Sequence, residues 1–204
     1  MKQTRAVVFG VLCVGLAALP ALAKKPLVGI PLEWRPTTVQ AEMGAVDLTG
    51  LDRAVIKVET FADKRTVDDP KLVGENREKA VMTVTTKDDV LTWCTDSLRT
   101  VLSKAGLPVG ADKETVTISG ELQSFFVVEQ DTYVGDVTIK VKVTNRAGTV
   151  LWTGMANGAS KRWGRSYSAD NYNEVLSDSV MEAAYSLLKN QRFMDALAGK
   201  AGPK

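Results

Sequence analysis

The stretch from Ser160 to Tyr167 (SKRWGRSY) has the residue types that best suit a contact surface. It interleaves aromatic and cationic side chains in a segment that we expect to connect a strand to a helix. Tryptophan, tyrosine and arginine are enriched at binding hot spots because they bury a large area and keep polar groups for hydrogen bonds. The first candidate binding site therefore comprises Lys161, Arg162, Trp163, Arg165 and Tyr167.

A structural interpretation of the same segment competes with binding. Trp163 and Tyr167 would then hold the connection on the core, and the cations would simply be solvated. We favour this second interpretation, and the binding site stays a candidate. Asp63 and Arg65, two residues apart at the end of a predicted strand, are further candidates. Their simpler role is structural, with Asp63 bonded to turn amides and Arg65 to a carboxylate or a carbonyl.

The residue types on which many enzymes depend are missing. None of the 204 residues is a histidine, which excludes the usual serine and cysteine triads, HExxH metal sites and most zinc sites. The chain also has no P-loop and no GxGxxG motif, so we expect no nucleotide, no other cofactor and no metal. The protein is therefore predicted not to be an enzyme.

Two features could still point to catalysis. Asp63, Glu121 and Asp136 leave room for a hydrolase with paired carboxylates, of the kind that cleaves cell-wall glycosides. However, acidic residues on an exposed strand face are ordinarily solvated, and so small a sheet implies no deep pocket. Cys94 lies in the apolar stripe of a predicted helix, which indicates a small core residue rather than a nucleophile.

Residues 1–23 have the pattern of a secretory signal peptide. Two basic residues precede an apolar run from Ala6 to Leu19, and small residues follow up to Ala23, where we expect cleavage. An uncleaved anchor is the alternative, but the run is shorter than the roughly 20 residues that a bilayer crossing needs. Cys13 lacks the small residue expected before a lipidated cysteine, so a lipid anchor is not expected.

The charge and cysteine content of the mature chain exclude further classes. Residues 1–23 hold two of the 26 basic residues and none of the 24 acidic ones, so the mature chain is balanced. A balanced chain argues against nucleic acid or anionic lipid as a partner bound by bulk charge. Cys94 is the single cysteine that remains, so no intrachain disulfide is expected.

The mature chain divides into an extended arm and one domain. Residues 24–50 contain three prolines, which rule out a helix and suit an arm that Leu32 and Trp34 could dock on the domain. A tether that keeps the domain away from a membrane is the functional alternative for this arm. Residues 51–200 are predicted to form a single domain, with no internal repeat.

Three extended segments predict an antiparallel meander. Residues 115–128 alternate apolar and polar side chains, with Val116, Ile118, Leu122 and Phe126 on the apolar side, and residues 134–144 alternate still more regularly. The third segment is residues 149–159, after a tight turn of Asn145–Gly148. Residues 54–61 predict an earlier strand, followed by a charged loop over residues 66–79.

Two amphipathic helices are also predicted. The first follows a capping box over residues 86–89, carries an apolar stripe over residues 90–105 and ends at Gly106. The second runs from near residue 168 or 170 to Leu188, with Asn190 as a cap at its end. The order predicts an α+β domain, in which two helices pack on one face of a four-stranded, mainly antiparallel sheet. The other face is expected to be exposed to solvent.

Four short motifs resemble the YajG-type family of bacterial envelope proteins. They are Phe61–Arg65 (FADKR), Val73-Gly74, Ala105-Gly106 and Gly148–Trp152 (GTVLW), within a resemblance that spans residues 54–190. More loosely, the order of elements is similar to LptE and to the N-terminal module of TolB. The resemblance implies an exported, non-enzymatic envelope protein, usually lipid-anchored at its N-terminus. This chain departs from that pattern because its candidate Cys13 is in the wrong context.

Export, the missing catalytic residue types and a solvated sheet face together favour a protein that acts by binding. We expect it in the periplasm, with association with the outer membrane left open. The expected partner is an envelope protein or a component of the cell wall or outer membrane, not nucleic acid. Peripheral membrane association and the oligomeric state are left open. A periplasmic lipid or glycan carrier is the main alternative, and it needs an apolar hollow lined by Leu98, Phe126 and Leu176.

Overall fold

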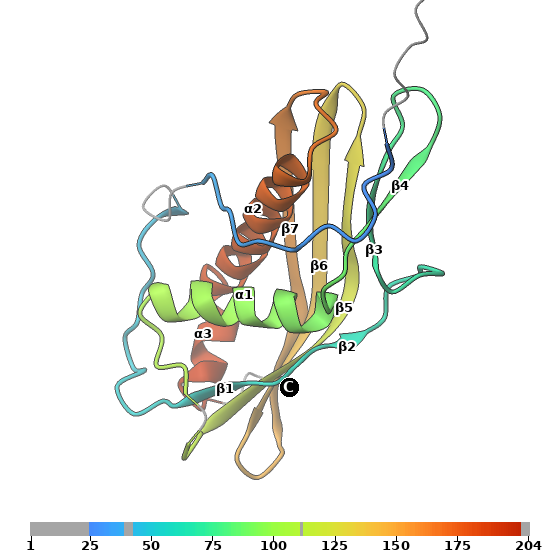
Figure 1. Cartoon of the computed structure of the whole chain (residues 1–204). Coiled ribbons are helices and arrows are strands. Elements are labelled where there is room, and N and C mark those ends of the chain that lie inside the picture. The colour runs from blue at the N-terminus through green and yellow to red at the C-terminus, as the bar shows by residue number, and fades with distance from the viewer. Residues whose placement is uncertain (1–24, 39–42, 111, 201–204) are drawn as a thin grey trace, which may run out of the picture.

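A seven-stranded mixed sheet forms one layer of the protein and three helices form the other (Figure 1). The computed structural model describes residues 25–38, 43–110 and 112–200. The strands are β1 (Ile56–Val58), β2 (Ala62–Asp63), β3 (Leu72–Asn76), β4 (Met82–Thr85), β5 (Val116–Glu129), β6 (Thr132–Asn145) and β7 (Val150–Trp163). The helices are α1 (Val90–Lys104), α2 (Ala169–Leu188) and α3 (Gln191–Leu197).

The predicted α+β class is correct, but the predicted four-stranded, mainly antiparallel sheet is wrong. The sheet has the order β4-β3-β5-β6-β7, and β1 and β2 pair with the edge of β5 that also pairs with β3. The meander of β5, β6 and β7 is antiparallel, as expected, whereas β1, β2 and β3 all run parallel to β5. The strand predicted over residues 54–61 is broken into β1 and β2.

Strands β3 and β4 account for the remaining difference from the predicted sheet. Strand β3 lies within the predicted charged loop, and no strand was predicted at β4. Both are short, and among the described strands β4 pairs only with β3. Strand β3 pairs in turn with β5, a distant part of the chain, with Gly74 opposite Val127. A side chain at Gly74 would not fit, since an added Cβ would lie 2.6 Å from Val127 O and 2.7 Å from Tyr172 Cε1. Gly74 suggested a loop in the sequence, but it marks a close contact within the sheet.

A β-bulge in β5 changes which side chains face the helices. The register with β6 shifts between Leu122 and Ser124, which leaves Gln123 as the extra residue. As a result Phe125 is buried at 1% exposure, and Phe126 lies on the opposite face of the sheet. The prediction that Phe126 shares a face with Leu122 is therefore wrong, because alternation along a sequence does not reveal an inserted residue.

Helix α1 begins three residues later than a cap at Thr86 implies. Asp89 is its N-cap and accepts a hydrogen bond from Thr92 N at 2.7 Å, while the Thr86 hydroxyl donates to Ile30 O at 2.8 Å. The predicted apolar stripe is otherwise correct. Cys94 is fully buried in it, and burial raises the pKa of its thiol to about 12, which confirms its role in the core.

Helices α1 and α2 pack on the same face of the sheet, as predicted. Phe125 on that face contacts Trp93 of α1, with ring centroids 5.6 Å apart. On the same face α2 rests directly on β7, since a Cβ at Gly158 would lie 1.9 Å from Ser179 O. Asn190 caps the start of α3 rather than the end of α2, because its side chain accepts from the amides of the first turn of α3.

The N-terminal arm docks across the helices, and Leu32 and Trp34 contribute as expected. Leu32 is buried, and the Trp34 ring lies 6.0 Å from the Trp93 ring. The arm's amides bond to side chains of the domain, with Leu32 N donating to Asp88 at 2.7 Å and Arg35 N donating to Ser177 at 2.9 Å. The predicted signal peptide lies outside the described residues. None of the helices within the described ranges is long and apolar enough to cross a bilayer.

Candidate binding surface at the distal rim

Five of the seven predicted site residues lie at one end of the sheet. A row of register partners crosses this end, from Arg162 through Tyr133, Glu129 and Asn76 to Met82. Five strands spaced by about 4.8 Å make the row about 20 Å wide. We call the segments beyond this row or within a few residues of it the distal rim, and they are residues 25–28, 77–81, 130–132 and 161–165. The distal rim is the upper end of the molecule in Figure 1.

The arm reaches the distal rim because it runs alongside β4. Ile30 forms a parallel bridge with Thr86, so residue 25 lies near the level of Val81. The backbone amide of Leu27 donates to the Tyr167 hydroxyl at 3.0 Å, which ties this part of the arm to the loop after β7. The described chain therefore begins at the same end of the sheet as the predicted contact residues.

Trp163 ends β7 and stands out from the distal rim. Its side chain is 81% exposed, the highest value among the large hydrophobic residues in the described ranges. Lys161, two residues before Trp163, lies on the same outer sheet face. Its register partner Val134 lies beside it and is 45% exposed. The interpretation in which Trp163 packs on the core is therefore wrong. A tryptophan leaves roughly 160 Å² of apolar surface in water at this exposure, so covering it could contribute about 4 kcal/mol before the costs of association.

The three cations of the predicted site have different surroundings. Arg162 bonds to Asn171 and pairs with Glu174 at 2.6 Å, and Arg165 pairs with Asp131 at 2.5 Å. Lys161 is exposed, and no acidic side chain in the described residues pairs with it. The expectation of simple solvation is thus right for Lys161 and wrong for the two arginines.

Tyr167 has the structural role that was expected of it. It is 7% exposed, and its backbone amide donates to Glu129 Oε1 at 2.9 Å while its hydroxyl accepts from the arm. Its φ of 46° lies in the left-handed region, which costs a non-glycine residue about 1–2 kcal/mol. These contacts offset that strain and fix the loop that follows Trp163.

Glu129, a fully buried carboxylate beneath the distal rim, was not predicted from the sequence. Besides the Tyr167 amide, it accepts from the Tyr172 hydroxyl at 3.1 Å. Burial and the nearby Glu129 charge raise the pKa of Tyr172, so that hydroxyl remains a donor. Tyr133 packs edge-on against Tyr172, with ring centroids 5.3 Å apart. The alternation after the bulge could have revealed Glu129, because it lies four residues after Phe125 and therefore on the same inward face.

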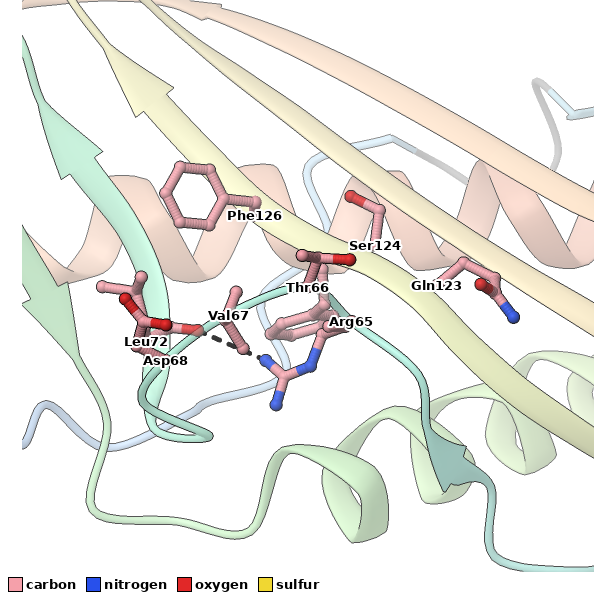
Figure 2. A pocket seen from close by; sticks show the side chains of 9 residues that line it. Arg65, Thr66, Val67, Asp68, Leu72, Gln123, Ser124 and Phe126 are labelled. Atoms are coloured by element: carbon pink, nitrogen blue, oxygen red, sulfur yellow. Dashed lines mark hydrogen bonds between the residues drawn. The ribbon is translucent and has the colours of Figure 1, made fainter.

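Asp63 and Arg65 lie away from the distal rim. Asp63 is the register partner of Leu122, seven residues before Glu129 and hence about 20 Å from it along β5. The Arg65 side chain is only 2% exposed, and it bonds to Asp63 at 2.7 Å and to Pro70 O at 2.8 Å. It also donates to Leu72 O at 3.2 Å (Figure 2). The Arg65 guanidinium holds the pKa of Asp63 below its ordinary value. The pair therefore ties the end of β2 to the start of β3, as the structural interpretation expected.

A pocket of about 490 Å³ opens beside this pair, where one edge of β5 is unpaired between the end of β2 and the start of its pairing with β3 (Figure 2). Thr66, Val67 and Asp68 of the intervening loop line it together with Phe126 of β5. Arg65 borders the pocket, but its bonds to Asp63 and to the loop carbonyls already occupy most of its donors. Within the described residues, no hydrogen bond joins the lining hydroxyls of Thr66 and Ser124 to Asp68, so the pocket shows no nucleophile paired with a base.

The carboxylates proposed for a hydrolase do not converge. Glu121 faces outward and pairs with Lys140 at 3.4 Å, whereas Asp63 is on the inward side with Leu122. Asp136 is four residues from Lys140 on β6, which separates it from Glu121 by about 13 Å. Glycosidase carboxylates lie roughly 5–10 Å apart across one cleft, so this arrangement does not supply the pair.

The apolar hollow expected for a carrier is also not formed by the predicted residues. Leu98 and Leu176 are both 0% exposed in the packed core between the helices and the sheet. Phe126 lies on the other face of the sheet, in the pocket beside Arg65. The three side chains therefore do not line one cavity.

Comparisons with known proteins bear on the fold. No family model and no curated protein matches the chain. The crystal structure of a Xanthomonas campestris protein of the family DUF330 has a TM-score of 0.50 and 10% sequence identity, over 85% of this chain and 94% of that chain. A solved structure described as an uncharacterized protein gives 0.49 and 11%, over 72% and 95%. A minor lipoprotein from Acinetobacter baumannii gives 0.37 and 10%, over 71% and 93%.

At such low identity the likeness is one of fold. The finer resemblances to the YajG-type family, to LptE and to TolB stay predictions. The chain thus has the α+β fold of a DUF330 protein from Xanthomonas campestris.

Proposed function

We propose that the protein is exported to the bacterial envelope and acts there by binding a partner at the distal rim, not by catalysis. The observation that carries this proposal is the position of Trp163, which is 81% exposed at the end of a long core strand. Large aromatic side chains of this kind are the usual anchors of binding surfaces. An exposed tryptophan side chain contributes little to the stability of the fold.

Rigid support beneath Trp163 strengthens the proposal. Arg162, the preceding residue, is held by Glu174 of α2, and the following loop is fixed by the contacts of Tyr167 with Glu129 and the arm. A surface that is ordered before binding loses less conformational entropy when a partner docks. The surroundings of Trp163 therefore suit a preformed contact site.

Export rests on the leader-like pattern of residues 1–23, which also implies the periplasm as the destination. The expected partner is an envelope protein or a component of the cell wall or outer membrane. The carrier and hydrolase alternatives have less support, because Leu98, Phe126 and Leu176 do not share a cavity and Glu121 and Asp136 are far apart along the sheet.

Fractionation and affinity capture test the proposal together. The full chain, tagged at its C-terminus, is expressed in bacteria and followed in cytosolic, periplasmic and membrane fractions. Envelope extracts are then passed over the wild-type protein, Trp163→Ala and Val150→Ala. Val150 is a matched control, because it is 53% exposed at the opposite end of β7.

We expect a shortened protein outside the cytosol. We also expect that Val150→Ala captures the same component as the wild type, and that Trp163→Ala captures at least about tenfold less of it, as for a hot-spot residue. Circular dichroism verifies that both variants are folded. An unprocessed cytosolic protein, or equal capture by the wild type and folded Trp163→Ala, would refute the proposal.

A further inference from the structure

Protruding apolar side chains stand at opposite ends of the distal rim, with Trp163 at one end and Val81 and Val28 at the other. Trp163 is 81% exposed on β7, and Val81 is 65% exposed at the end of the loop between β3 and β4. The register row from Arg162 to Met82 separates them by about 20 Å. Between them the rim consists of the short turn at Gln130 and Asp131 and does not form a continuous apolar patch.

The charges of the distal rim are not balanced, although those of the whole mature chain are. Its acidic residue Asp131 is neutralised by Arg165, and Arg77 is paired with Glu75 of β3. Three exposed lysines have no acidic partner within the described residues, and they are Lys25, Lys79 and Lys161. Glu78 is the remaining acidic side chain of the rim, so the local excess is positive.

We propose that the distal rim rests on the surface of an anionic lipid bilayer, with Trp163 and Val81 entering the interface and the three lysines at lipid phosphates. This inference rests on the proposed function and specifies its partner. Tryptophan favours the membrane interface because its ring is apolar and its indole N–H is polar. Lysine chains can reach outward to headgroups while their methylene stems lie along apolar surface.

The spacing of the two apolar tips favours a bilayer over a protein as the occupant. A protein partner would need two separate pockets about 20 Å apart, whereas a fluid interface accepts isolated side chains at any spacing. The described chain also begins at this end of the sheet, with the exposed Lys25.

Vesicle binding by the full chain tests the inference. The probes are vesicles of phosphatidylcholine alone and of phosphatidylcholine with about one third phosphatidylglycerol, which carries the negative charge. Co-sedimentation gives the partition coefficient, and the emission shift lost in Trp163→Phe reports whether residue 163 enters the interface. Lys142→Glu and Val150→Ala are controls, because both residues are exposed and lie far from the distal rim.

We expect binding to the anionic vesicles that is at least tenfold stronger than to the neutral ones and that weakens with salt. Lys79→Glu and Lys161→Glu should each weaken binding by about fivefold or more, since one lysine near an anionic surface contributes about 1 kcal/mol. Trp163→Ala and Val81→Ser should weaken it further, and the two controls should leave it unchanged.

The outcomes separate this inference from the proposed function. Absent vesicle binding, or binding that the rim variants and the controls change equally, overturns the bilayer as the occupant. If capture of an envelope protein still depends on Trp163 in that case, the binding function stands with a protein partner. If neither vesicles nor envelope extracts distinguish Trp163→Ala from the wild type, both proposals fail.

Discussion

Gly158→Ala should destabilise the protein by about 3 kcal/mol, because α2 lies directly on the backbone of β7 at this residue. A Cβ at position 158 would lie 1.9 Å from Ser179 O and 2.4 Å from Ala183 N, both main-chain atoms of a packed helix. Carbon atoms in ordinary contact are about 3.5 Å apart, so the helix would have to move by about 1 Å or more. Overpacking costs about 1–3 kcal/mol, and the upper value applies because no flexible side chain can turn aside.

Urea and thermal unfolding, followed by circular dichroism, measure the effect. For a domain of this size about 3 kcal/mol corresponds to a fall in Tm of roughly 6–12 °C. Gly110→Ala is the matched control, because its new Cβ would lie 3.6 Å from Val55 Cγ1, an ordinary contact. We expect the control within about 0.5 kcal/mol of the wild type.

A Gly158→Ala protein as stable as the control would refute the close seating of α2 on β7. That seating matters for function because Asn171 and Glu174 of α2 hold Arg162, the residue before Trp163. A displaced α2 would therefore also loosen the support of the distal rim.

Three further changes test other parts of the structure. Asp63→Asn should lower the free energy of unfolding at neutral pH. The Arg65 guanidinium lowers the pKa of Asp63 in the folded protein, so the ionised carboxylate stabilises the fold fully above its unfolded pKa near 3.8. This stabilisation is lost as the pH falls through the lower folded pKa. Urea unfolding at neutral and acidic pH checks this. A stability difference between the wild type and Asp63→Asn that does not depend on pH would contradict it. Cys94 should resist iodoacetamide in the native protein at mildly alkaline pH, because burial raises its pKa to about 12, and should react in guanidinium; rapid native labelling would count against its burial. Asp89→Ala should cost about 1 kcal/mol by removing the N-cap acceptor of Thr92, and Asp89→Ser should restore most of it; unchanged urea unfolding would argue against this cap.

The meander and both long helices were predictable because their patterns are local. The apolar alternation on β6 and the stripes on α1 and α2 each reflect one buried face of one element. Strands β3 and β4 were not predictable in this way. They are four or five residues long, and β3 is stabilised by parallel pairing with β5, whose residues lie about fifty positions further along the chain.

The sequence predicted the segment that holds the candidate site, but not the burial and pairing of each of its side chains. Residue types alone drew attention to the segment around Trp163, but burial of each side chain depends on tertiary structure. The bulge at Gln123 changed the inward register and brought Glu129 beneath the rim, where it fixes Tyr167. Trp163 is exposed on the outer sheet face because β7 continues to that residue, beyond the predicted end of the third segment at residue 159.

A photo-reactive amino acid at position 163 of the full chain would show directly whether the distal rim meets a partner in living cells. Position 150, at the other end of β7, provides an exposed control on the same strand. We predict a crosslinked product with an envelope lipid or protein at position 163 that is absent at position 150. A folded, exported protein that gives no product at position 163, or the same products at both positions, would contradict a binding role for this surface.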